Sequence, residues 1–127
     1  DLDGDIQEGS TWEALQFAGY HCLDNLICFV DSNGWQATAK VDEVVGKSKI
    51  HIQAREFGWH SLKTKVELAS TLNQTLNKRV LKQNKPKLVV CGTVKGSGVS
   101  FMENDNNWHY KSPTKFELEE ALKELEN

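Results

Sequence analysis

The sequence lacks an excess of positive charge and a long apolar run. Its 127 residues include 15 Lys and Arg against 18 Asp and Glu, which gives a formal net charge of −3. A chain without a basic field has little attraction for nucleic acid. No apolar run approaches the ~20 residues that a membrane-spanning helix needs. We therefore expect neither a nucleic-acid partner nor a membrane partner.

Cysteine is also scarce, and the few cysteines form no metal-binding or disulfide pattern. Cys22, Cys28 and Cys91 are odd in number and lack CxxC spacing, so we expect reduced thiols in the core. No charged N-terminal segment leads into an apolar stretch, and the sequence therefore shows no signal peptide. Both features favour a cytoplasmic location.

What the chain does contain is the composition of one globular domain over residues 1–127. Hydrophobic residues make up 39% and charged residues 26%, which is ordinary for such a domain. Two apolar runs, at 26–30 and 87–94, are typical of strands buried on both faces of a parallel sheet. The segment GWHSLKT at 58–64 predicts a short strand between these two in the sequence.

Helical periodicity separates the predicted strands. We expect helices from near Thr11, in 41–45, in 50–57, over 68–80 and over 114–125. The first and last carry capping boxes, at 10–13 and 114–117, and Gly58 is typical of a residue that ends a helix. This alternation of helix and strand predicts an α/β fold, a parallel sheet with flanking helices.

Two polar residues stand where a parallel sheet presents its ligand loops. Asp3 lies just before the first helix, whose free N–H groups favour an anion, and Asn33 follows the first strand. Both loops would open on the same edge of the sheet, and carboxylate and amide oxygens suit Mg²⁺. Gly4 would let the backbone approach a phosphate. The alternative is that Asp3 only caps the chain start and residues 31–34 form an ordinary turn.

Four segments together resemble the thiamine diphosphate-binding domain of transketolase. They are LDGDIQEGSTWEAL at 2–15, DNLICFVDSNGWQ at 24–36, EFGWH at 56–60 and GTVKGSGVSFMENDNNWHYK at 92–111. Asp3 and Asn33 stand 30 positions apart (33 − 3 = 30), as in the family motif. The resemblance covers nearly the whole chain and corresponds to the C-terminal half of the diphosphate-binding domain. It implies part of a thiamine diphosphate-binding fold.

The resemblance implies a set of cofactor ligands. Mg²⁺ would be held by Asp3, by the Asn33 side chain and by the backbone carbonyl of Trp35. Gly4 and Asp5 would lie at the diphosphate. Leu2 departs from the family pattern, because it stands where the first glycine of Gly-Asp-Gly is usual.

Two further residues receive catalytic roles from the resemblance. Glu8 matches a glutamate in a carboxylate network at the subunit interface, and His109 matches a histidine near the diphosphate and the donor sugar. Without the resemblance, Glu8 is equally a solvated glutamate of a first helical turn, and His109 a structural residue of a loop. Gly96 and Gly98 would permit a tight loop near the cofactor.

The function implied is that of a transferase part, which binds thiamine diphosphate and Mg²⁺ for two-carbon ketol transfer between sugar phosphates. The pyrimidine-binding domain or subunit that would complete the site is not in this sequence, so we expect the isolated chain to be inactive. Half a sheet exposes an unpaired edge, which favours a homo-oligomer. The alternative is a truncated, non-catalytic fragment that acts only as a folded or interaction module.

Overall fold

The computed structural model describes residues 2–44, 46, 48–66 and 69–126, with the side chains of 2, 3, 69 and 79 outside the description. The strands are β1 (Ile27–Ser32), β2 (His60–Lys65) and β3 (Lys87–Gly92). The helices are α1 (Leu2–Asp5), α2 (Gly9–Tyr20), α3 (Val41–Val44), α4 (Ile50–Glu56), α5 (Ala69–Thr75), α6 (Lys78–Leu81) and α7 (Lys115–Leu125), with a short 3₁₀ helix, η1, at Asn106–His109. Within this described part, no helix is long and apolar enough to cross a bilayer.

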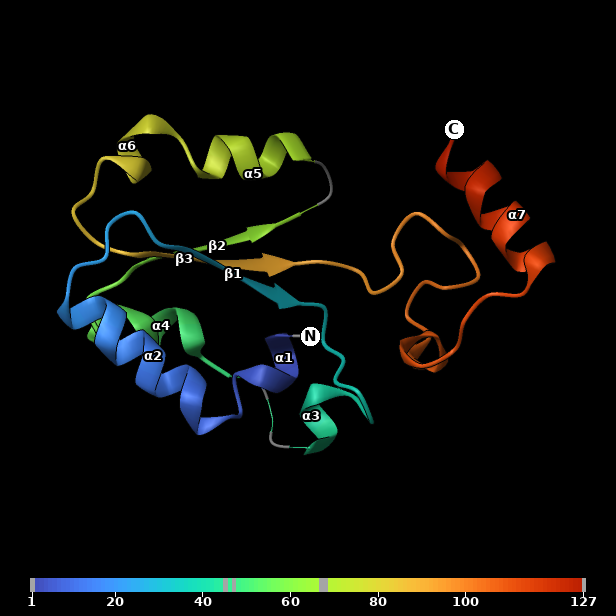
Figure 1. Cartoon of the computed structure of the whole chain (residues 1–127), viewed down its shortest axis with the longest axis horizontal. Coiled ribbons are helices and arrows are strands. Elements are labelled where there is room, and N and C mark those ends of the chain that lie inside the picture. Colours follow the sequence, from blue (N-terminus) through green and yellow to red (C-terminus); the bar gives the residue numbers. More distant parts are fainter. Residues whose placement is uncertain (1, 45, 47, 67–68, 127) are drawn as a thin grey trace.

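The three strands form one parallel sheet, as the alternation of elements predicts, and their order in the sheet is β1-β3-β2. The last strand in sequence is therefore the central one, and its residues 87–91 are all buried. The register aligns Ile27 and His60 with Lys87. Because all three strands run the same way, their carboxyl ends meet at one edge of the sheet (Figure 1).

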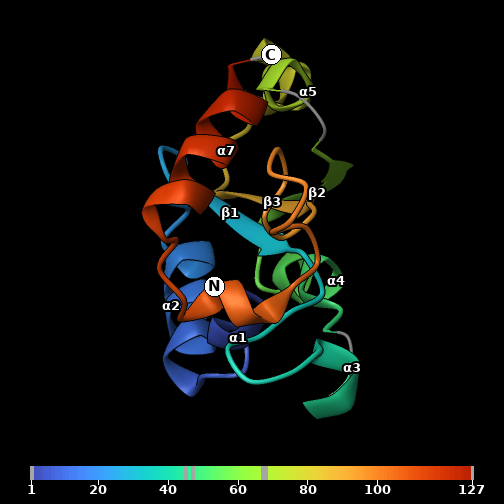
Figure 2. The same ribbon diagram turned by 90° about the vertical axis from the view of Figure 1, so that its right-hand side faces the viewer.

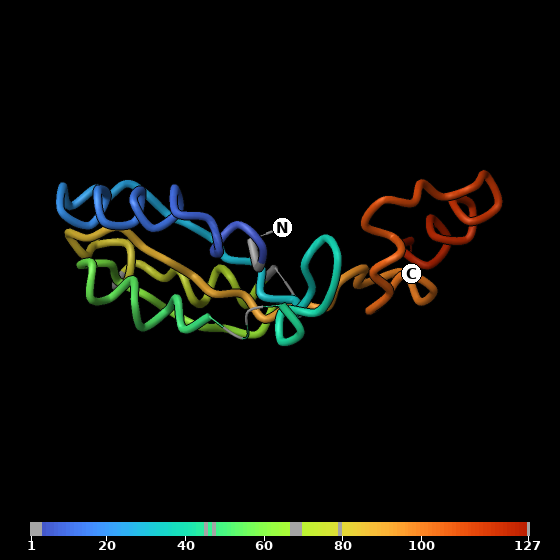
Figure 3. The backbone as a smooth tube through the Cα atoms, turned by 90° about the horizontal axis from the view of Figure 1, so that it is seen from below, coloured from blue at the N-terminus to red at the C-terminus, as the bar shows by residue number. Residues whose placement is uncertain are grey.

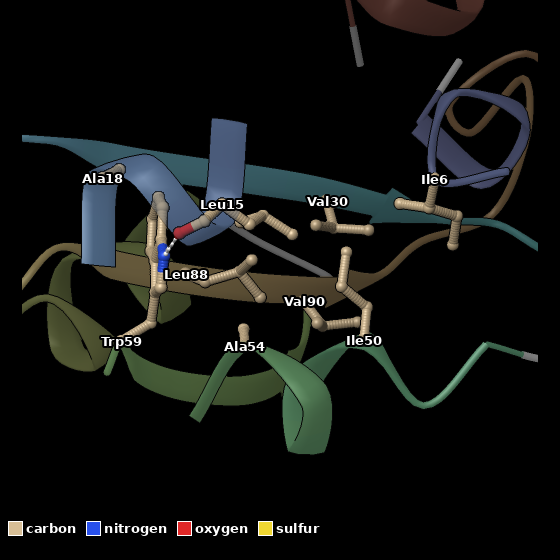
Figure 4. Close-up of a cluster of buried hydrophobic side chains, with 9 residues drawn as sticks. All are labelled: Ile6, Leu15, Ala18, Val30, Ile50, Ala54, Trp59, Leu88 and Val90. Atoms are coloured by element: carbon tan, nitrogen blue, oxygen red, sulfur yellow. Dashed lines mark hydrogen bonds between the residues drawn. The ribbon is translucent and has the colours of Figure 1, made fainter. Parts of the chain in front are cut away.

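Helices cover both faces of the sheet. α1, α2 and α4 lie on one face, and α5 and α6 lie on the other (Figures 1 and 2). Side chains alternate between the faces of a strand, so every second residue faces the α2 and α4 layer. These side chains and those of the helices form the core cluster drawn in Figure 4: Ile6, Leu15, Ala18, Val30, Ile50, Ala54, Trp59, Leu88 and Val90.

Trp59 joins the two helices of this layer. It lies just after α4, is 4% exposed and donates a hydrogen bond from Nε1 to the Leu15 carbonyl of α2, at 2.8 Å (Figure 4). Gly58, with φ +92°, ends α4 as the sequence predicts, because glycine adopts this left-handed conformation without steric cost. The segment 56–60 thus has a packing role in the fold.

α2 begins earlier than predicted, and the prediction of a capping box at 10–13 is wrong. The N-cap is Glu8, whose side chain makes no capping hydrogen bond. The physical reason is the corner between α1 and α2. Thr11 donates from Oγ1 to the Asp5 carbonyl at 2.8 Å, and Trp12 donates from Nε1 to the Ile6 carbonyl at 2.9 Å. The Thr11 and Trp12 side chains are held by carbonyls of the turn before the helix, so both residues already lie inside a helix that begins at Gly9.

Two other local predictions also need correction. The helix predicted over 68–80 is two helices, α5 and α6, because Asn77 interrupts it and accepts at Oδ1 from the N–H of Val80, at 3.2 Å. Cys22 is exposed, not a core thiol, because α2 ends at Tyr20 and Cys22 adopts φ +50° beyond the helix. Cys91 is buried and Cys28 is half-buried.

The segment after β3 leaves the sheet and forms a separate lobe that ends in α7 (Figures 1 and 3). The predicted capping box at the start of α7 is confirmed, since Thr114 and Glu117 exchange both hydrogen bonds. Ser100 holds α7 through its N–H and hydroxyl, which both donate to Glu124. Ala121 is buried, whereas Phe116 and Leu125 are 71% and 61% exposed. Most of the large apolar side chains of α7 are therefore exposed in the described structure.

Candidate functional site

Asn33 and the loop that it begins lie at the edge where the strands end. β1 ends at Ser32, and Asn33 and Gly34 follow directly. α1 packs beside β1, with its C-terminal neighbour Ile6 in the core. A cavity of about 280 Å³ lies between these elements. Its lining includes Ile6, Val30, Ser32, Asn33, Gly34, Val41, Ser48, Ile50, His51, Lys63 and Val90.

Asn33 has a defined orientation at this edge. Its Nδ2 donates to Asp31 Oδ2 at 3.2 Å, and its Oδ1 accepts the N–H of Trp35 at 2.8 Å. The second contact closes an Asx turn, in which the side chain takes the place of a backbone carbonyl. A carbonyl oxygen has two lone pairs, so Oδ1 retains acceptor capacity for a cation.

Asp31 joins the loops that follow two neighbouring strands. Its Oδ2 accepts from Asn33 on the β1 side, and its Oδ1 accepts from the hydroxyl of Thr93, just after β3. The negative charge of Asp31 also affects the pKa of the Cys91 thiol. Burial raises the pKa of that thiol, and the Asp31 carboxylate raises it further. The carboxylate therefore acts as a charged link across this edge.

Trp35 begins a small antiparallel turn beyond the sheet. It pairs with Lys40 in an isolated bridge, and the Lys40 ammonium lies 5.3 Å from the centroid of the Trp35 ring. The Gly34 carbonyl accepts from the N–H of Val41, at the start of α3. These contacts define the path of the backbone that presents the Trp35 carbonyl.

The predicted residues of the N-terminal segment occupy a helix and not the open loop that we expected. Asp3 and Gly4 lie within α1, beside β1, and the side chain of Asp3 lies outside the described part. A Cβ on Gly4 would meet no atom within 4 Å, so its surroundings are open. Asp5 is exposed at the end of α1, and Glu8 is exposed at the N-cap of α2.

His109 lies in η1, in the C-terminal lobe. Its Nδ1 is 3.3 Å from the ammonium of Lys95, which follows β3. Because an ammonium can only donate, a hydrogen bond in this contact has Nδ1 as its acceptor. Asn106, in the same turn, donates to the Ala37 carbonyl at 3.2 Å, which ties the lobe to the loop after β1. Gly96 and Gly98 have φ +74° and +95°, as the predicted tight loop requires.

Several polar residues of the cavity were not predicted from the sequence. Lys63 aligns with Val90 in the sheet register, and Val90 aligns with Val30, so all three share a face. Ser48 and His51 approach from the start of α4. The sequence carried no signal that singled out Lys63, because its inward position follows from the strand register. Among the side chains that are described, no group of three His, Cys, Asp or Glu could hold a metal ion.

The sequence matches the family described as transketolase, thiamine diphosphate binding domain, over residues 2–125. The chain belongs to this transketolase family. It is 32% identical over 123 residues to one subunit of the apulose-4-phosphate transketolase of Phocaeicola vulgatus, in an alignment that covers 97% of the chain and 44% of that protein. It is 30% identical over 125 residues to transketolase of Rattus norvegicus, where the alignment covers 97% of the chain and 19% of that protein.

A comparison of this structure with solved structures also finds the transketolase fold. The transketolase from Campylobacter jejuni superposes with a TM-score of 0.84 at 24% identity, over 97% of this chain and 19% of that chain. The predicted α/β fold with a parallel sheet is thus confirmed as part of a thiamine diphosphate-binding fold. The chain spans less than half the length of the relatives it matches, 44% and 19% here. The roles of Asp3, Asn33 and His109 remain predictions.

Proposed function

We propose that this chain is the part of a transketolase that binds thiamine diphosphate through Mg²⁺, for two-carbon ketol transfer between sugar phosphates. The observation that carries the proposal is the orientation of Asn33, whose carboxamide oxygen stands at the edge where all three strands end. Ligands of α/β proteins bind at this edge. Family membership supplies the cofactor class.

The donor set fits Mg²⁺. This ion prefers hard oxygen ligands in an octahedron and fills the remaining positions with phosphate oxygens and water. Asn33 Oδ1, the Trp35 carbonyl and the carboxylate of Asp3 are the oxygens assigned to it, and backbone segments of all three flank the same edge. Gly4 and Asp5 follow Asp3 in α1 and would lie at the diphosphate.

Three further residues, His109, Lys63 and His51, would bind and orient the cofactor or the donor sugar. His109, whose Nδ1 lies 3.3 Å from the Lys95 ammonium, is the residue proposed to lie near the diphosphate and the donor sugar. Lys63 and His51 line the cavity next to Asn33, so the Lys63 ammonium would lie near the diphosphate that we propose to bind there. Thiamine diphosphate, when bound, supplies the electron sink for breaking and forming the ketose carbon–carbon bond.

A complete enzyme needs more than this chain. Curated relatives are longer or are named as one subunit of an enzyme, as the Phocaeicola vulgatus protein is. We propose that a pyrimidine-binding domain or subunit completes the site, that the assembly is a homo-oligomer with Glu8 at an interface, and that it is cytoplasmic. β1 is an edge strand of the described sheet, and Phe29 on it is 40% exposed, which leaves apolar surface for such a partner.

The test is calorimetric titration of thiamine diphosphate into the chain with Mg²⁺ and then with EDTA. We expect binding that requires Mg²⁺, that is abolished in Asp3→Ala, and that is weakened but still measurable in Asn33→Ala, which keeps two of the three proposed protein ligands. The matched control is Asn73→Ala, an exposed asparagine of α5 on the other side of the sheet, which should bind as the parent does. The chain alone should show no ketol transfer.

The rival function is a folded interaction module with a vestigial site. It predicts no Mg²⁺-dependent binding in a chain whose circular dichroism shows that it is folded. Binding that is equal in Asn33→Ala and in the parent would also contradict the proposed site, because the ligand would then be held elsewhere.

A further inference from the structure

We infer that Asp31 and Thr93 are positioning residues for the metal site, because together they fix which end of the Asn33 side chain faces the cation. The inference rests on the proposed function, in which Asn33 Oδ1 is a Mg²⁺ ligand. The inference adds two residues that would not themselves contact the cofactor or the metal ion. Asp31 acts through Asn33, and Thr93 acts through Asp31.

The carboxamide of an asparagine has two ends of similar shape and opposite function. Oδ1 can bind a cation, whereas Nδ2 carries only donors and repels one. Rotation of the side-chain amide by a half turn therefore replaces a ligand with a non-ligand. An ionised aspartate accepts hydrogen bonds and cannot donate them. Next to Asp31 Oδ2, only the Nδ2 end of Asn33 forms a bond, and the 3.2 Å contact has this sense.

The contact with Trp35 selects the same orientation from the other end of the amide. The Trp35 N–H needs an acceptor, which Asn33 Oδ1 provides at 2.8 Å. This bond alone leaves the plane of the amide free to tilt about one point. The bond to Asp31 adds a second point, so the pair of bonds sets both the position and the plane of the carboxamide. Hydrogen bonds of this kind behind a metal ligand orient it.

Thr93 makes the arrangement depend on two strands. Its hydroxyl donates to Asp31 Oδ1, so the aspartate is held from the β3 side while it holds Asn33 on the β1 side. The register pairs Ser32 with Gly92, and Asn33 and Thr93 are the next residues along the chain from these two. Without the hydroxyl, the carboxylate can rotate away from Asn33. Thr93 thus couples the metal ligand to the central strand.

The experiment uses Mn²⁺ as the probe, with thiamine diphosphate present, and measures free Mn²⁺ by electron paramagnetic resonance. We expect Thr93→Val to weaken Mn²⁺ binding by about 10-fold and Asp31→Asn by about 10- to 100-fold, the range for partners behind a metal ligand. Thr93→Ser keeps the hydroxyl and should restore the parent affinity. Thr64→Val on β2 makes the same replacement away from the site and should have no effect.

A double-mutant cycle separates positioning from general damage to the fold. In an Asn33→Ala background there is no carboxamide to orient, so Thr93→Val should cause no further loss. An equal loss in both backgrounds would overturn the inference and assign Thr93 a structural role. A loss in Asp31→Asn with no loss in Thr93→Val would also overturn it, because Asp31 would then bind the cation directly.

A second readout does not need the metal. The Nδ2 proton that Asn33 donates to Asp31 should give an exchange-protected NMR signal in the parent chain and in Thr93→Ser. In Thr93→Val the protection should fall. Protected signals together with no Mn²⁺ binding by the parent would reject the proposed metal site while the hydrogen-bonded arrangement stands. Parent binding of Mn²⁺ with unprotected Asn33 signals would reject the positioning role alone.

Discussion

Gly19→Ala should destabilise the chain, although helix propensity alone predicts the opposite. In an exposed helix interior, alanine is favoured over glycine by about 1 kcal/mol. Gly19 lies near the end of α2, where the helix crosses the segment that leaves α4. A Cβ at this position would stand 1.7 Å from the Phe57 carbonyl oxygen and 3.3 Å from Trp59 Cδ1. The first atom belongs to the backbone and cannot rotate aside.

The size of the effect follows from the movement required. Real Cβ contacts are essentially never below 3.0 Å, so the two segments must separate by at least 1.3 Å (3.0 − 1.7). Overpacking of a core costs about 1–3 kcal/mol. The same movement strains the buried bond from Trp59 to the Leu15 carbonyl, and such a bond contributes about 1 kcal/mol. After the gain in propensity, we expect a net loss of about 1–3 kcal/mol in the free energy of unfolding.

The assay is urea unfolding followed by circular dichroism, with Gly9→Ala as the matched control. Gly9 begins the same helix, and a Cβ there would meet no atom within 4 Å, so this variant should be neutral or up to about 1 kcal/mol more stable. With a slope of about 2 kcal/mol per molar urea, Gly19→Ala should lower the midpoint by roughly 1 M. A Gly19→Ala chain as stable as the parent would refute the packing of α2 on the segment after α4.

Two further predictions concern titratable groups. Burial, and then nearby cations led by Arg55, hold the pKa of His60 below 6.5, so the unfolded chain binds more protons and stability should fall as the pH drops below about 6.5. Urea midpoints from about pH 7.5 to 5 test this, and His60→Asn should reduce the slope. Lys95→Met should shift the His109 proton partly from Nε2 to Nδ1, visible in ¹⁵N chemical shifts, whereas Lys111→Met should not.

Periodicity predicted the three strands and most of the helices because each is encoded locally, whereas α1 and η1 lie in segments that were expected to be loops. β1 and β3 contain the continuous apolar runs at 27–30 and 88–91, and β3 is central and buried. The order β1-β3-β2 was not predicted, because strand order depends on how crossover helices pack and not on any one segment. The errors in the predicted helix bounds also come from contacts between segments. α2 starts at Gly9 because Thr11 bonds to a carbonyl of α1, a contact across a chain reversal that a capping pattern does not report.

The candidate site divides in a similar way. Asn33 was recognised because an asparagine directly follows a strand, and the structure places it where the strands end. Lys63 was missed because a single lysine in a short strand is also typical of a solvated edge residue. Lys63 lines the cavity because it aligns with Val90 in the sheet. That alignment follows from the strand register, which the sequence does not report. Inward and outward positions of an edge strand differ by one residue of register.

The link between Asp31 and Thr93 shows why register matters more than spacing at this edge. The two residues are 62 positions apart, and no local pattern connects them. Once β1 and β3 are parallel with Ser32 opposite Gly92, the residues that follow each strand become neighbours. A polar residue at the end of one strand then meets the loop of the next, and a carboxylate between them can hold both. The chemistry of Asn33 therefore depends on the central strand, which is the last of the three in the sequence.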